Sequence, residues 1–185
     1  MKLAPGLQQV EPIPTPFGVP DGAGDADRAD RAGRILSHAE LGQLVRATAS
    51  ARTTWLPIVR FIFEQRWFHR IALTADYEIW LLTWLPGQHT GFHDHGDASG
   101  AFAVAQGELR ETVAAARRTQ VRRRTAATGS VTTFGGRHLH DVGNVAAAPA
   151  VSVHAYSPPL SAMRRYAMTS AGLALVRTER AELDW

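Results

Sequence analysis

The stretch GQHTGFHDH, residues 87–95, decides the fold together with its glycine-rich continuation over residues 96–107. Successive side chains of an extended strand point to opposite faces, so His93 and His95 point to the same side. Two imidazoles that converge in this way are typical of metal ligands. The stretch therefore predicts a strand that carries half of a metal site.

A second glycine-rich segment, residues 129–144, contains His138-Leu139-His140 and ends at Asn144. Six of the eight histidines fall between His89 and His154, which favours one shared site over scattered positions. The spacing to Asn144 favours His140 as the third ligand. His138 has the same strand parity and is its rival.

The composition indicates one globular domain. The chain has 185 residues, 45% hydrophobic and 20% charged, which suffices for one packed core. It contains no cysteine, so thiolate ligands and disulfides are excluded, and histidines and carboxylates remain as metal donors. The first part is rich in proline and glycine, so we expect a loosely ordered arm over residues 1–34 and a single domain over residues 35–185.

Charge and hydropathy exclude other classes of partner. No apolar run approaches the roughly 20 residues that span a bilayer, so we expect a cytoplasmic protein without membrane contact. The formal net charge is +3, and much of the basic excess lies in an arginine cluster at residues 117–124. Without interleaved aromatic residues or a reading motif, this cluster indicates a solvated hairpin and no nucleic-acid site.

Helices are expected before the strands begin. Ser37 can cap a helix while Glu40 reaches back, and Leu36 and Leu41 are placed as a hydrophobic staple. Helical spacing of apolar residues continues after a break, over residues 55–63. The sequence predicts helices that pack outside whatever follows.

Short apolar runs separated by turn residues dominate from Trp67 onward. The predicted strands lie at residues 71–73, 77–85, 101–105, 131–134, 151–156, 166–168 and 173–176. Their regular spacing is typical of a mostly β chain folded as a small β-barrel or jelly roll.

Here the chain resembles a known family. Residues 87–107 are similar to the first cupin motif with its glutamate replaced by Gly100, and residues 129–144 resemble the second motif. With residues 151–159, VSVHAYSPP, they resemble the cysteine dioxygenase type I family of thiol dioxygenases. The animal enzymes carry a cysteine, crosslinked to the active-site tyrosine, where this chain has Gly100, so the chain resembles the bacterial branch.

The resemblance implies a cupin fold and an Fe(II) site held by His93, His95 and His140. Three neutral imidazoles would leave the iron its full charge, which attracts an anionic thiolate, and would leave positions open for substrate and O2. The resemblance further implies that both oxygen atoms are added to the thiol sulfur, which gives a sulfinic acid.

A polar row lies in the predicted strand at residues 150–156. Ser152, His154 and Tyr156 share one face and alternate with Val151, Val153 and Ala155. A hydrogen-bonded core stripe would have the same pattern. Beside a metal, we expect the row to act in catalysis by orienting Tyr156 toward substrate or O2.

An arginine would bind the substrate carboxylate, because its fork of donors matches two oxygens. Arg70 is the candidate, since the resemblance implies an arginine just upstream of the strand at residues 77–85. Arg66 and Arg60 are rivals.

We therefore expect an iron-dependent dioxygenase that converts L-cysteine to cysteine sulfinic acid, as a monomer or a weak homo-oligomer. One alternative is the dioxygenase of mercaptopropionate or another small thiol. The other is a non-enzymatic cupin that binds a small acid through a metal, because a fold alone does not determine a function.

Overall fold

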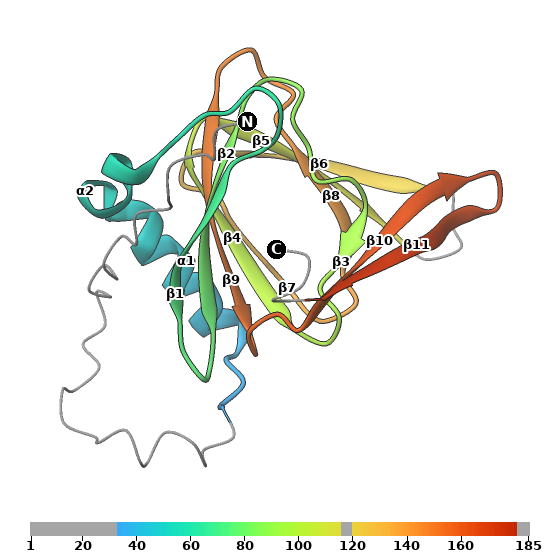
Figure 1. Ribbon diagram of the computed structural model, residues 1–185, viewed down its shortest axis with the longest axis horizontal. Coiled ribbons are helices and arrows are strands. Elements are labelled where there is room, and N and C mark those ends of the chain that lie inside the picture. The colour runs from blue at the N-terminus through green and yellow to red at the C-terminus, as the bar shows by residue number, and fades with distance from the viewer. Residues whose placement is uncertain (1–32, 116–119, 181–185) are drawn as a thin grey trace, which may run out of the picture.

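The computed structural model describes residues 33–115 and 120–180, which form two β-sheets with helices on one outer side (Figure 1). The strand order is β1-β2-β9-β4-β7 in the five-stranded sheet and β11-β10-β3-β8-β5-β6 in the six-stranded sheet. The elements are α1 (His38–Ser50), α2 (Arg52–Trp55), the 3-10 helix η2 (Leu56–Ile58), β1 (Phe68–Leu73), β2 (Glu78–Trp84), β3 (His93–Asp94), β4 (Ser99–Gln106), β5 (Glu108–Ala114), β6 (Val121–Ala127), β7 (Val131–Phe134), β8 (Leu139–Gly143), β9 (Ala150–Ser157), β10 (Ala162–Thr169) and β11 (Gly172–Arg180).

Helix α1 begins where the sequence predicts. The Ser37 side chain accepts from the backbone N–H of Glu40, and the Glu40 carboxylate accepts from the backbone N–H of Ser37, which completes a capping box. Leu36 and Leu41 are both buried, as expected of a staple. The helix lies against the outer face of the five-stranded sheet (Figure 1) and packs on β4, β7 and β9.

The second predicted helical stretch is wrong beyond Ile58. Only α2 and η2 form, and Phe63 is 87% exposed. Backbone carbonyls after Ile58 are taken by side chains from elsewhere: Thr83 donates to the carbonyl of Arg60 and Gln88 to that of Ile62. These contacts hold the segment in an irregular path toward β1.

Two apolar clusters build the core. One fills the space between α1 and the outer face of the five-stranded sheet, with Leu41, Trp55 and Val153 fully buried. The other lies inside the barrel and includes Trp84 and Phe102. Strand β9 contributes to both, with Val153 on one face and Tyr156 on the other, so its alternation decides which side chains enter the barrel.

The predicted mostly β barrel with helices outside is confirmed, and each predicted strand lies wholly or largely within an observed one. Within the arginine-rich segment, Arg122, Arg123 and Arg124 lie on β6, which pairs with β5, and all three are exposed. Most of the arm predicted for residues 1–34 lies outside the described residues. In the part of the chain that is described, no helix is long and apolar enough to cross a membrane.

Candidate metal centre

Three histidines meet inside the barrel. His93 lies on β3 and is paired with His140 on β8, and His95 follows β3 directly. One nitrogen from each ring can be chosen so that all three lie within 4.8 Å of one another. All three side chains are buried, with exposed fractions of 4%, 2% and 1% for His93, His95 and His140.

Hydrogen bonds leave a nitrogen lone pair free on each ring. His93 Nδ1 lies 2.9 Å from the carbonyl oxygen of Gly91, and His140 Nδ1 lies 2.7 Å from Glu111 Oε1. Both acceptors lack a proton, so each Nδ1 donates and each Nε2 keeps its lone pair. Neither ring nitrogen of His95 has a partner among the described residues.

Electrostatics keep these rings neutral. Burial lowers the pKa of His93 and of His95 well below the usual range, and the neighbouring histidines lower both further. Burial also lowers the pKa of His140, against the opposing effect of Glu111. Three buried, neutral imidazoles with free lone pairs fit a divalent cation that accepts nitrogen donors.

The other two histidines of the motif region do not belong to this cluster, although the His138 ring is adjacent to that of His140. His138 donates from Nε2 to Glu111 Oε1 at 2.9 Å and stacks on Phe134. His89 is 63% exposed at its side chain and lies 3.4 Å from Asp141. Of the two rivals for the third position, His140 is the one that the structure brings to His93 and His95.

Gly100 cannot be replaced by the glutamate of the usual cupin motif without rearrangement. A Cβ at this position would lie 2.5 Å from Phe134 Cε2 and 3.0 Å from Tyr156 Cδ1. The Phe134 and Tyr156 rings therefore occupy the space that a carboxylate side chain would need. Tyr156 also contacts His95, with 4.7 Å between the ring centroids.

The polar row on β9 is connected by hydrogen bonds, and the partners at its start indicate which atom donates and which accepts along the row. Trp84 Nε1 donates to Ser152 Oγ at 2.9 Å, so the Ser152 hydroxyl is free to donate to His154 Nε2, also at 2.9 Å. Burial, Arg66 and His140 lower the pKa of His154 to about 3, so the ring is neutral. Its single proton is then on Nδ1, 3.5 Å from the Tyr156 hydroxyl.

Tyr156 at the end of this row stays a phenol. Burial raises the pKa of Tyr156 well above its usual value, and the nearby Glu78 carboxylate adds to the effect. Because His154 presents a proton to the phenol oxygen, the Tyr156 O–H can turn toward the cavity. The row is thus arranged to present one proton donor beside the histidine cluster.

A cavity of about 200 Å³ opens beside both features. Its wall comes from both sheets and from the segments that join them: Arg66, Phe68, Trp80, Leu82, Thr90, His93, His140, Val142, His154, Tyr156, Leu160, Met163, Arg165 and Glu179. The volume suits a small molecule rather than a polymer.

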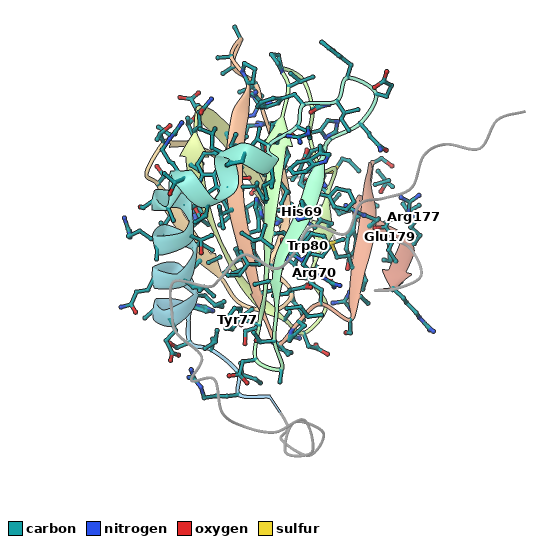
Figure 2. The ribbon with its side chains drawn as sticks, turned by 60° about the vertical axis from the view of Figure 1, so that its left-hand side comes forward. His69, Arg70, Tyr77, Trp80, Arg177 and Glu179 are labelled. Atoms are coloured by element: carbon teal, nitrogen blue, oxygen red, sulfur yellow. The ribbon has the colours of Figure 1, made fainter. Side chains whose placement is uncertain are left out.

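Arg70 does not line this cavity. It points from β1 to Glu78, with 3.6 Å between Nη1 and Oε2, and its side chain is 42% exposed. Figure 2 shows it next to Trp80, whose ring lies 5.4 Å from the guanidinium carbon. Phe68, on the same face of β1, and Trp80, the β2 partner of Arg70, both line the cavity, so Arg70 lies next to the cavity wall without being part of it.

Arg66 does line the cavity. Its guanidinium lies 4.9 Å from the Trp84 ring, and its Nε is buried without a hydrogen-bond partner among the described residues. Burial and the adjacent Arg165 lower the pKa of Arg66 to about 10, so it stays charged at neutral pH.

Arg165, the other arginine of the cavity wall, is already engaged. Its Nε donates to Glu179 at 2.7 Å and its Nη1 to the carbonyl of Thr90. Glu179 also accepts from Arg177, beside it in the outer hairpin (Figure 2). Arg66 is therefore the arginine with donors still to satisfy.

Sequence reasoning missed Trp84, Arg165 and Glu111 as parts of the site. Glu111 had a signal: it shares strand parity with the buried Leu109, so a carboxylate stands where an apolar residue is expected. Trp84 and Arg165 had none, because a tryptophan in a strand is typical of a core and an arginine in a strand is typical of a surface.

Several solved structures are similar to part of this chain. TT1209 from Thermus thermophilus is 20% identical, with 56% of this chain and 93% of that one covered and a TM-score of 0.50. An uncharacterized double-stranded β-helix protein from Klebsiella pneumoniae subsp. pneumoniae is 19% identical over 78% and 98% of the chains, at a TM-score of 0.46. An oxalate oxidase in complex with glycolate is 16% identical, with 49% of this chain and 50% of that one covered and a TM-score of 0.44. This chain therefore spans about half the length of the oxalate oxidase.

No curated protein matches the sequence. The family comparison is specific: residues 32–169 match cysteine dioxygenase type I, a range that contains the three clustered histidines, the β9 row and Arg66. This match supports thiol dioxygenase activity in general and a metal cofactor. The chain belongs to the cysteine dioxygenase type I family.

Proposed function

We propose that this protein is an Fe(II)-dependent dioxygenase that converts L-cysteine and O2 to cysteine sulfinic acid. The thiol RSH gains both atoms of O2 and becomes RSO2H, so no further reductant is needed. The observation that carries the proposal is the cluster of His93, His95 and His140, neutral and without a carboxylate among its members, beside a small cavity. Family membership supports the reaction class.

His93, His95 and His140 are the residues that would hold the iron. When bound, Fe(II) would supply open coordination positions for a thiolate and O2, and the electrons that activate O2. A set of three imidazoles leaves the ion more positive than a set that includes a carboxylate, and so favours an anionic sulfur ligand.

Tyr156 is proposed to donate its phenol proton to the reacting groups in a hydrogen bond. Ser152 and His154 orient it, since the proton of His154 is directed to Nδ1 by the Ser152 hydroxyl. The raised pKa of Tyr156 keeps the phenol protonated, so it serves as a hydrogen-bond donor rather than as a base. The apolar wall formed by Leu82, Val142 and Met163 would exclude water.

Arg66 is proposed to bind the substrate carboxylate in place of Arg70. It lines the cavity and has an unsatisfied buried Nε, whereas Arg70 is not part of the cavity wall and is paired with Glu78. A carboxylate would satisfy two guanidinium donors at once. This contact favours cysteine or mercaptopropionate over cysteamine, which has no carboxylate.

Oxygen uptake by the iron-loaded protein tests the proposal. Cysteine, mercaptopropionate and cysteamine are supplied in turn, with metal-free protein as the control. We expect fast uptake with cysteine, little with cysteamine, and none without iron. Uptake with mercaptopropionate but not cysteine would replace the substrate, and no uptake with any thiol would contradict the dioxygenase assignment and favour a binding protein.

A further inference from the structure

Glu111 on β5 is a buried carboxylate that contacts the histidine cluster from behind. Its exposed fraction is 0%. Oε1 accepts from His140 Nδ1 at 2.7 Å and from His138 Nε2 at 2.9 Å, and Oε2 accepts from Arg124 Nε on the neighbouring strand β6. Both carboxylate oxygens are therefore engaged by donors.

This carboxylate is ionised. The guanidinium of Arg124, which can only donate, contacts Oε2, and two imidazole nitrogens lie 2.7 and 2.9 Å from Oε1, a setting that favours the charged carboxylate. An ionised carboxylate can only accept. It therefore requires a proton on His140 Nδ1 and leaves the Nε2 lone pair on the side of His93 and His95.

The three clustered rings differ in the hydrogen-bond partner of the ring nitrogen that points away from the cluster. His140 has a carboxylate, His93 has the neutral carbonyl of Gly91, and His95 has no partner among the described residues. A carboxylate behind an imidazole holds the ring orientation and makes the opposite nitrogen a stronger donor. A carboxylate cannot enter the cluster at Gly100, because Phe134 and Tyr156 occupy that space.

We infer that Glu111 is a positioning residue that fixes His140 and passes negative charge to the metal site through the His140 ring. This inference rests on the proposed role of His140 as a metal ligand. His138 and Arg124 share the same carboxylate and so limit the charge available to His140. The cupin carboxylate that is missing at residue 100 is thus replaced, in part, by one that acts across an imidazole.

The group Glu111, His138 and His140 could instead be taken for a second metal site, since one atom from each lies within 4.8 Å of the others. The observed distances of 2.7 and 2.9 Å are those of N–H donors on a carboxylate oxygen. Such donors already satisfy that oxygen without an ion. We therefore expect one metal equivalent per chain.

The test measures the iron-loaded protein without thiol, so that it does not depend on dioxygenase activity. Its readouts are the Fe(III)/Fe(II) midpoint potential and the Zn²⁺ affinity from competition with a chelator. Glu111→Gln should raise the potential, because less negative charge favours Fe(II), and should weaken Zn²⁺ binding about 10- to 100-fold. Arg124→Gln should lower the potential, because the carboxylate is no longer shared with a cation.

Two controls separate this role from general damage or remote charge. Arg122→Gln removes an equal charge from an exposed position on β6 and should leave the potential unchanged. In the Glu111→Gln background, Arg124→Gln should have little further effect, because its influence passes through Glu111. Glu111→Asp keeps the carboxylate, and its potential should lie between those of the wild type and Glu111→Gln.

Opposite shifts for Glu111→Gln and Arg124→Gln would support the inference, since a purely structural role predicts the same loss in both. Unchanged potential and affinity in Glu111→Gln, or shifts of the same sign, would overturn it. Should Glu111→Gln not fold, Arg124→Gln and Glu111→Asp decide the question by the same criteria. A second metal equivalent that His138→Ala removes would also overturn it, whereas a wild type that binds no metal would instead refute the proposed function.

Discussion

Two groups of buried residues meet beside the cavity, and both contain neutral histidines. The cluster of His93, His95 and His140 comes from the β3 region and β8 of the six-stranded sheet, whereas His154 belongs to the row on β9 of the five-stranded sheet. Burial lowers the pKa of all four rings. Burial and charge state therefore do not distinguish them.

The hydrogen bonds of the rings distinguish the two groups. In the row, Ser152 contacts one ring nitrogen of His154 and the Tyr156 hydroxyl lies near the other. Both nitrogens of His154 are therefore used to orient hydrogen bonds along the strand. In the cluster, His93 and His140 each use only Nδ1, and His95 uses neither nitrogen within the described residues. A lone pair without a partner indicates a metal ligand, and a ring with two partners indicates a proton relay.

Removing one ring from each group tests this difference with the largest expected effect. His140→Ala should abolish iron binding, a loss beyond the ~10- to 100-fold that follows when only a ligand's hydrogen-bond partner is removed. His154→Gln should bind iron as the wild type does. Metal content after reconstitution and dialysis measures both.

His138→Ala is the matched control for the cluster, because His138 is the neighbouring histidine on the same segment. It should retain the metal. If His138→Ala lost the metal and His140→Ala kept it, the ligand role would pass to His138.

Tyr156→Phe removes only the proton donor of the row. We expect kcat to fall about 100-fold, as for loss of a positioned proton donor, with metal content unchanged. Tyr77→Phe, at a tyrosine outside the cavity wall, should retain wild-type kcat (Figure 2). Equal kcat in the Tyr156→Phe variant and the wild type would remove the row from the mechanism.

Two arginines allow a comparison between a residue of the cavity wall, Arg66, and one that lies next to the wall, Arg70. Arg66→Gln should raise KM for cysteine about 10- to 100-fold, the cost of losing charged hydrogen bonds to a carboxylate. Arg70→Gln should change KM little, since Arg70 is paired with Glu78 and is not part of the cavity wall. Steady-state kinetics on both variants measures these KM values. A raised KM in Arg70→Gln with an unchanged KM in Arg66→Gln would assign the carboxylate contact to Arg70.

The smallest expected effect concerns stability and pH in the metal-free protein. The folded-state pKa of His154 is about 3, below its unfolded value, so between pH 6.5 and pH 3 the unfolded chain binds a proton that the folded chain does not. Stability therefore falls as pH falls, by about 1 to 2 kcal/mol from His154 between pH 6.5 and pH 5.

Urea unfolding at the two pH values measures this slope. His154→Gln should show a shallower loss of stability than the wild type, because one of the buried histidines is gone. Identical slopes would mean that His154 is not held neutral by burial.

Local patterns predicted much of this molecule. The Ser37 capping box, the strand alternation of Ser152, His154 and Tyr156, and the pair His93 and His95 depend on neighbours a few residues away. The sequence therefore predicted the starts of elements and the shared faces.

Features that depend on register across strands were beyond reach. The path of the chain from Ile58 to β1 brings Arg66 rather than Arg70 to the cavity wall. The contact of Glu111 with His140 joins residues 29 positions apart. Such contacts depend on tertiary packing and on strand register, which local sequence patterns do not specify.

The most direct test of the central claim is the fate of isotopically labelled O2 supplied to the iron-loaded protein with cysteine. The account predicts cysteine sulfinic acid in which both added oxygen atoms carry the label, measured by mass spectrometry, and no such product from His140→Ala. A product that carries one labelled atom, or oxidation to cystine without sulfinic acid, would contradict it.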